Sequence, residues 1–131
     1  MTTETIAASA GGTSASARFS LGIDLGTTHC ALSWVDKAAS DGERVAQGVL
    51  AIPQLTAPAS VEARALLPSF LYLPHESEFS PADLALPWGA SQDGVVGECA
   101  RTRGAATPIR LVSSAKSWLC HPGVDRRAPL L

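Results

Sequence analysis

The sequence lacks any apolar run approaching the roughly 18 residues that would span a bilayer. It also lacks a strong charge of either sign: charged residues make up 17% of the 131 residues, and the formal net charge is −2. A balance this close to neutral argues against an electrostatic nucleic-acid binder. A hydrophobic fraction of 46% is too high for a wholly disordered chain. The composition therefore predicts one domain at most, with neither nucleic acid nor membrane as a partner.

Cysteine is scarce and shows no pairing pattern. The chain has three cysteines and no C-x-x-C unit, which excludes a disulfide framework. We expect free thiols in core or half-buried positions, as in a reducing cytosol. Two His–Cys neighbours, His29-Cys30 and Cys120-His121, lack the paired spacing of zinc ligands, so a zinc site is not expected.

The two ends of the chain differ in character. Residues 1–18 are mostly Ala, Ser, Thr and Gly, without the basic and apolar regions of a secretory signal, and they predict a disordered tail on a cytoplasmic protein. The other end stops at Leu130-Leu131 with no polar tail. We expect residues 19–131 to be one folded unit, cut short there.

Apolar patterning predicts an α/β chain that begins with a β-hairpin. The hairpin has strands at 19–24 and 30–35, and its turn is the four residues Leu25-Gly26-Thr27-Thr28. Further strands are expected at 49–55, 66–73 and 95–96, and helices at 97–106 and 109–119, the second closed by Pro122. The connecting segments are predicted to be a loop at 36–48 and a long surface excursion at 74–94. The acidic residues of that excursion, Glu76, Glu78 and Asp83, are expected to be solvated.

The string Leu21-Gly22-Ile23-Asp24-Leu25-Gly26-Thr27-Thr28 carries the chemistry. Gly26 lets the backbone approach an oxyanion closely, and the two threonines add hydroxyls to their own N–H groups. Successive N–H groups in a turn form an anion-binding nest. Asp24, at the end of an apolar strand, offers the hard oxygen ligand that suits Mg²⁺. The string therefore predicts a phosphate-binding hairpin.

Two other phosphate loops are excluded by their motifs. The chain has neither G-x-x-x-x-G-K-[ST] nor a G-x-G-x-x-G that enters a helix. A strand-like run follows the turn instead. A plain hairpin, whose Gly and Thr merely suit a turn, remains the alternative at this point.

Four strings, in order, resemble the 70-kDa heat-shock chaperones of DnaK type, which are actin-like ATPases. The first is Ile23-Asp24-Leu25-Gly26-Thr27-Thr28, which looks like that family's first phosphate motif. The others are Leu67-Pro68-Ser69-Phe70, Val95-Val96-Gly97-Glu98-Cys99-Ala100 and Ser114-Ala115-Lys116-Ser117-Trp118-Leu119. The long chaperone-like relatives with an S-A-K-S-W-L-C-H-P-G string look most similar. The resemblance as a whole covers about residues 19–127.

The resemblance implies ATP or ADP and Mg²⁺ as cofactors. Asp24 would hold the metal, through water. Gly26, Thr27 and Thr28 would contact the nucleotide phosphates. His29 would occupy the next position, which usually holds Tyr or Asn.

The resemblance also makes Lys116 the catalytic lysine that reaches the terminal phosphate. Its ammonium would offset charge on the transferred phosphoryl group. The composition agrees in part, because the chain has eight arginines and only two lysines, Lys37 and Lys116. Leu67 departs from the family's usual Thr, and Ser117 and Trp118 replace Arg and Leu.

The implied fold is part of a ribonuclease-H-like lobe, with a mixed sheet that starts at the phosphate hairpin. The implied function is that of a chaperone-like ATPase, with unfolded polypeptides and co-chaperones as partners of a longer protein. Whether this chain is itself an enzyme stays open, since the second lobe of such ATPases cannot fit in 131 residues. We therefore expect the isolated chain to bind nucleotide weakly or not at all.

Two alternatives remain. A sugar kinase of the same superfold also begins with such a hairpin, although the downstream strings argue against it. It would yield a phosphorylated sugar or glycerol rather than free phosphate. A non-catalytic interaction module is the other alternative.

Overall fold

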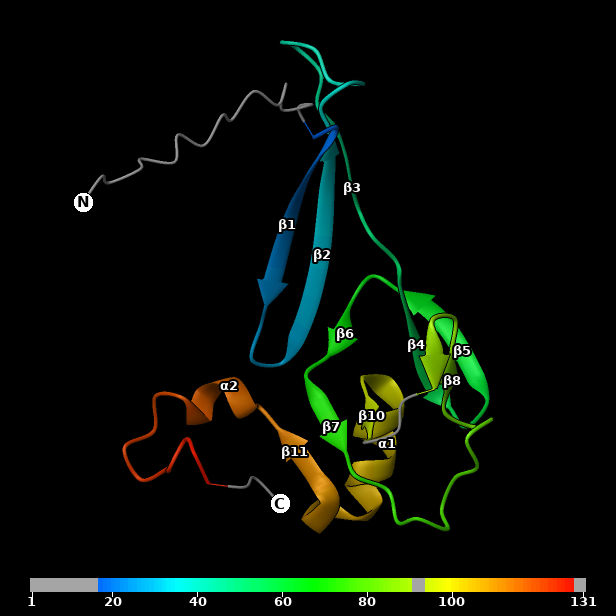
Figure 1. The fold of residues 1–131 in the computed structure, drawn as a ribbon. Helices are drawn as coiled ribbons and strands as arrows, with labels where there is room; N and C mark the ends of the chain where they lie inside the picture. Colours follow the sequence, from blue (N-terminus) through cyan, green and yellow to red (C-terminus); the bar gives the residue numbers. More distant parts are fainter. Residues whose placement is uncertain (1–16, 91–93, 129–131) are drawn as a thin grey trace, which may run out of the picture.

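A computed structural model of the chain describes residues 17–90 and 94–128 (Figure 1). The fold is mixed α/β, with mostly antiparallel strands and few helices, which confirms the coarse fold class. The predicted tail at 1–18 lies outside the described residues except for its last two. Among the described helices, none is long and apolar enough to cross a membrane.

The chain begins with the predicted hairpin, which stands away from the rest of the fold (Figure 1). Strands β1 (Phe19–Leu25) and β2 (His29–Asp36) pair antiparallel along their whole length, from Phe19 opposite Asp36 to Leu25 opposite Cys30. Because side chains alternate between the faces of a strand, Leu25 and Cys30 share one face, and Asp24 lies on the other. All seven residues of β1 are exposed.

An ion pair fastens the end of the hairpin that lies far from its turn. The guanidinium of Arg18 donates two hydrogen bonds to one oxygen of Asp36, at 3.1 and 2.6 Å, and a third to the other oxygen at 3.0 Å. The Asp36 carboxylate is almost fully buried. These hydrogen bonds, more than the opposing effect of burial, hold the pKa of Asp36 below its ordinary value.

Two short strands, β3 (Ala46–Val49) and β6 (Leu67–Pro68), extend the hairpin into a four-stranded sheet. The strands after the hairpin differ from the predicted boundaries. Strand β3 (Ala46–Val49) pairs with β2 inside the segment predicted as a loop at 36–48. The predicted strand at 49–55 is divided, because the chain leaves β2 after Val49 and starts β4 (Ile52–Ala57) in a separate pair with β5 (Ser60–Arg64). The sequence analysis did not predict β5, whose alternation is weak.

The predicted strand at 66–73 is also divided, at Ser69. Strand β6 (Leu67–Pro68) pairs with the start of β2, whereas β7 (Phe70–Tyr72) belongs to a second sheet. That sheet has the order β10-β7-β11, from β10 (Val95–Val96) to β11 (Leu111–Ser113). Because of this interruption, β6 pairs with the hairpin strand β2 while β7 pairs within the second sheet.

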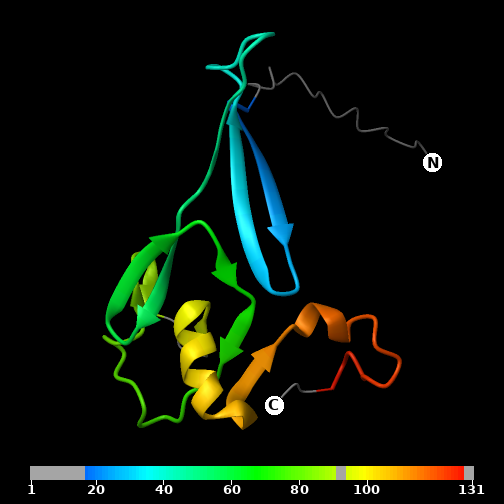
Figure 2. The ribbon, with the colours of Figure 1, turned by 180° about the vertical axis from the view of Figure 1, so that it is seen from behind.

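The helix predicted at 97–106 is confirmed as α1 (Glu98–Ala106), which packs against β7 and β4 (Figure 2). The helix predicted at 109–119 is wrong over most of its length. A short 3₁₀ turn (Pro108–Arg110) is followed by β11, and only α2 (Ala115–Trp118) is helical. Leu111 to Ser113 are extended because they pair with Tyr72 to Phe70, and that pairing outweighs their helical spacing.

The core lies between α1, β4 and the second sheet, away from β1. Its buried members are Leu55, Tyr72, Leu84, Val95, Cys99 and Ala100. Gln54 is buried beside them and bonds two backbone groups: its Nε2 donates to the carbonyl of Leu66 at 2.8 Å, and its Oε1 accepts from the N–H of Glu98 at 3.1 Å. A polar side chain at that depth is retained because both of its ends are satisfied.

The predicted surface excursion at 74–94 is attached to the core rather than loose. Leu84 from this segment is buried in the core, and Phe79 packs against it. The segment then forms a small hairpin, β8 (Ala85–Leu86) and β9 (Gly89–Ala90), with Trp88 exposed at its turn. Residues 91–93 lie outside the described part.

Candidate phosphate site at the hairpin turn

The turn between β1 and β2 is tight enough to require glycine at position 26. A Cβ placed on Gly26 would fall inside the contact distance of the backbone carbonyl oxygen of His29. Because this obstacle is backbone, no rotation of a side chain relieves it. The close approach at Gly26 is thus to the chain itself, and the predicted approach of this backbone to an oxyanion stays a prediction.

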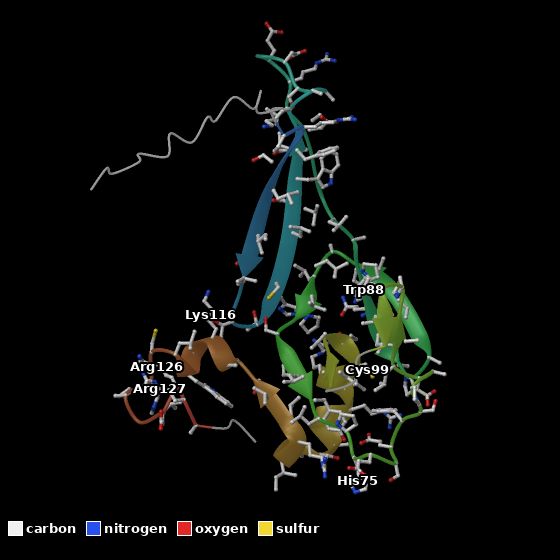
Figure 3. All side chains as sticks on the ribbon, viewed as in Figure 1. His75, Trp88, Cys99, Lys116, Arg126 and Arg127 are labelled. Atoms are coloured by element: carbon white, nitrogen blue, oxygen red, sulfur yellow. The ribbon has the colours of Figure 1, made fainter. Side chains whose placement is uncertain are left out.

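Lys116 reaches this turn from 91 residues away in the sequence. Its Nζ donates a hydrogen bond of 2.7 Å to the backbone carbonyl of Leu25, immediately before Gly26. Figure 3 shows its side chain standing on α2 toward the end of the hairpin. Ser114 turns the chain between β11 and α2 by adopting a left-handed conformation, with φ 50° and ψ 33°. The structure thus brings together the predicted lysine and the predicted phosphate turn.

Ser69 is a second contact to the turn, and the sequence analysis did not assign it a role. Its Oγ donates to the carbonyl of Gly26 at 2.8 Å, and its N–H donates to the carbonyl of Thr28 at 2.9 Å. The only signal in the sequence was its place within the Leu67-Pro68-Ser69-Phe70 string. Nothing in that local pattern indicates which backbone groups it would meet.

A hollow of about 610 Å³ lies beside the turn, between the hairpin, β6–β7, β11 and α2. Gly26, Thr27, Ser69 and Lys116 contribute to its wall. The remaining lining is mostly apolar: Leu25, Cys30, Leu67, Pro68, Phe70, Leu71, Val96, Val112, Ala115 and Leu119. An apolar wall of this kind does not suit a polyphosphate, so charged oxygens are better placed at the tip of the turn than inside the hollow.

The other predicted site residues are spread around the turn. Asp24 is exposed and lies on the face of the hairpin opposite Leu25 and Cys30, so its carboxylate is not in the wall of the hollow. Thr28 is exposed at the tip. His29 begins β2 opposite Pro68 of β6, so its backbone belongs to the sheet rather than to the turn.

A metal site made by the protein alone is not found. Within residues 17–90 and 94–128, no group of three or more His, Cys, Asp or Glu side chains could hold a metal ion. Asp24 would therefore act as a single protein ligand, and Mg²⁺ often takes only one or two carboxylates while phosphates and water fill its other positions. The single carboxylate of Asp24 would fit a Mg²⁺ ion whose other ligands come from a nucleotide and water.

The cysteines and the acidic segment contribute no further site. Cys99 is buried, as predicted, and burial raises the pKa of its thiol. Cys30 is half-buried as predicted, whereas Cys120 is exposed, contrary to the prediction. Glu78 accepts a hydrogen bond of 2.8 Å from the Tyr72 hydroxyl, whose pKa is raised by burial and by this carboxylate.

The geometry thus gathers one ammonium, one glycine turn and two threonine hydroxyls at the end of an exposed hairpin. Such a group can bind an anion through backbone N–H groups and one cation. Comparison with known proteins finds no matching family, no matching curated protein and no matching solved structure.

Proposed function

We propose that the hairpin turn is the phosphate-binding part of an actin-like ATPase of the 70-kDa heat-shock type, within a ribonuclease-H-like lobe. The observation that carries the proposal is the hydrogen bond between Lys116 and the carbonyl of Leu25. Two strings that resemble one family's phosphate motif and catalytic lysine lie 91 residues apart, yet they meet within hydrogen-bond distance. A plain hairpin gives no reason for that meeting.

The proposed roles follow from the position of each residue. The N–H groups and hydroxyls of Thr27 and Thr28 would receive phosphate oxygens of ATP or ADP at the tip of the turn. Lys116 would exchange its carbonyl partner for a phosphate oxygen, a charged acceptor that makes a stronger hydrogen bond. Its exposure leaves the ammonium free to make that exchange.

Mg²⁺ would supply charge neutralisation for the phosphates when it arrives with the nucleotide. Asp24 would hold it through water, from the exposed end of β1. Without the metal, the Asp24 carboxylate would repel the phosphates, so binding should require Mg²⁺. Folding of client polypeptides and contact with co-chaperones belong to the same proposal for a longer protein.

The test is a titration of the isotope-labelled chain with Mg·ADP, followed by amide NMR shifts. We expect millimolar binding that perturbs residues 26–28 and 116 first. Chelating the metal with EDTA should abolish the shifts. No perturbation of the turn at high millimolar Mg·ADP would contradict the proposal, and shifts confined to the apolar wall of the hollow would favour the interaction module instead.

The two lysines provide a matched pair of variants. Lys116→Gln should weaken Mg·ATP binding about tenfold, because a hydrogen bond to a charged group contributes about 1.5–3 kcal/mol and the exposure of Lys116 favours the lower end of that range. Lys37→Gln removes the same charge at the opposite end of the hairpin, where the Lys37 N–H bonds the carbonyl of Arg18. It should leave binding unchanged. Equal losses in the two variants would indicate a general charge effect.

A longer protein that contains this chain would test the catalytic role. Lys116→Ala should abolish ATP turnover while leaving most of the nucleotide binding, because the second lobe of such a protein would add contacts to the nucleotide that the isolated chain lacks. Unchanged turnover would refute that role, and a phosphorylated sugar or glycerol as product would identify the sugar-kinase alternative.

A further inference from the structure

Ser69 contacts the turn twice, through its side-chain hydroxyl and through its backbone N–H. It lies between β6 and β7, where the predicted single strand is interrupted. Its hydroxyl donates to the carbonyl of Gly26, and its N–H donates to the carbonyl of Thr28. Two carbonyls two residues apart are thus directed toward one residue.

The orientation of those carbonyls fixes the orientation of the amide groups that follow. In a trans peptide the C=O and the N–H of one plane point in opposite directions. When the Gly26 carbonyl points to Ser69, the N–H of Thr27 points away from it. The Ser69 hydroxyl therefore sets the direction of the first N–H group in the turn.

A thiol holds the Ser69 hydroxyl in place. The Sγ of Cys30 lies 3.5 Å from Ser69 Oγ, on the neighbouring strand. A serine hydroxyl has one hydrogen, and the Gly26 carbonyl can only accept, so that hydrogen belongs to the bond with Gly26. The Cys30 thiol is then the donor to Ser69. The three groups form a short chain that ends at the turn.

We propose that Ser69 is a positioning residue that aims the Thr27 N–H at a phosphate oxygen. This inference rests on the proposed function for the ligand, but the orientation of the turn is a property of the free protein. The Ser69 N–H bond to Thr28 continues the register of β2 with β6 by one residue, so the hydroxyl bond to Gly26 is the contact specific to the turn.

The experiment compares Ser69→Ala and Ser69→Thr with a matched control. Ser33→Ala removes a hydroxyl on the same hairpin, one that donates to the carbonyl of Gly22 at 3.3 Å, away from the turn. Two measurements are made on each protein: the amide shift and hydrogen-exchange rate of Thr27 in the free chain, and the dissociation constant for Mg·ADP.

We expect Ser69→Ala to shift the Thr27 amide, to speed its exchange and to weaken Mg·ADP binding about tenfold, the upper range for one net hydrogen bond. Ser69→Thr, which keeps the hydroxyl, should restore most of the Thr27 amide behaviour and most of the affinity for Mg·ADP. Ser33→Ala should change neither. An unmoved Thr27 amide in Ser69→Ala would overturn the inference, whatever happens to binding.

The two proposals fail in different ways. If the wild-type chain shows no Mg·ADP binding but Thr27 responds to Ser69→Ala, the ligand assignment fails and the positioning role of Ser69 stands. If the wild-type chain binds at the turn and Ser69→Ala leaves both measurements unchanged, the positioning role fails and the phosphate site stands.

Discussion

Replacing Gly26 with alanine tests the close backbone approach at the turn. The new Cβ would collide with the backbone carbonyl oxygen of His29. Overpacking costs about 1–3 kcal/mol, and the upper end applies because the obstacle is backbone. The substitution also restricts the unfolded chain, which returns about 0.4–1 kcal/mol. The free energy of unfolding should therefore fall by about 2 kcal/mol.

Gly22→Ala is the matched control, since it makes the same substitution three residues from the turn's start, within β1. There the new Cβ would meet only the Ser33 hydroxyl, at 2.7 Å. That hydroxyl can rotate away at the cost of one exposed hydrogen bond, about 0.5–1.5 kcal/mol, which the entropy gain nearly offsets. The net change should be close to zero.

Urea unfolding followed by far-UV circular dichroism and tryptophan fluorescence measures both variants. With a slope of about 2 kcal/mol per molar urea, Gly26→Ala should lower the midpoint by about 1 M. Gly22→Ala should leave it within a few tenths of a molar. If Gly26→Ala proves no more destabilising than Gly22→Ala, the turn does not bring Gly26 close to the His29 carbonyl. That result would contradict the turn geometry on which both proposals depend.

Three further predictions concern the rest of the fold. Gly104→Ala, in α1, would place a Cβ 2.7 Å from Leu111 Cγ. This clash should lower the free energy of unfolding by about 1 kcal/mol, measured by thermal unfolding, although alanine has the better helix propensity. A second substitution, Leu111→Ala, should remove the clash. Gln54→Leu should cost about 1–3 kcal/mol, because the carbonyl of Leu66 and the N–H of Glu98 lose their partner; a loss below 1 kcal/mol would mean that water replaces the side chain. The pKa of Asp36 is lowered by Arg18, so its carboxylate stabilises the fold at pH values above the ordinary carboxyl pKa of 3.8 and loses that contribution as the pH falls further. Asp36→Asn should therefore make the free energy of unfolding less dependent on pH in acid. An unchanged dependence on pH in acid would contradict this.

The elements that could be predicted from the sequence are those whose signals are local. The hairpin was predicted because alternating apolar residues flank a turn-forming Gly-Thr-Thr, and its register follows from the turn. Helix α1 and strand β10 were predicted for similar reasons. The helix at 109–119 was wrong because Leu111 and Val112 also suit a strand, and the choice depends on Tyr72 and its neighbours, about forty residues earlier.

The candidate site divides in the same way. Asp24, Gly26, Thr27 and Thr28 could be identified from the sequence because a phosphate turn is built from consecutive residues. The role of Lys116 depended on a resemblance, and the roles of all these residues remain proposals. Long-range contacts decided the surroundings of the turn, including the apolar hollow beside it.

By itself, the sequence determined that this chain has a tight hairpin turn with the donors for an anion, since backbone geometry at Gly26 and its neighbours is a local property. Only the tertiary structure decided what meets that turn. Lys116 reaches Leu25 across 91 residues, and Ser69 reaches Gly26 across 43. Each residue lies in a string that resembles one family, but the backbone group that it bonds depends on how separate sheets and a short helix pack around one another.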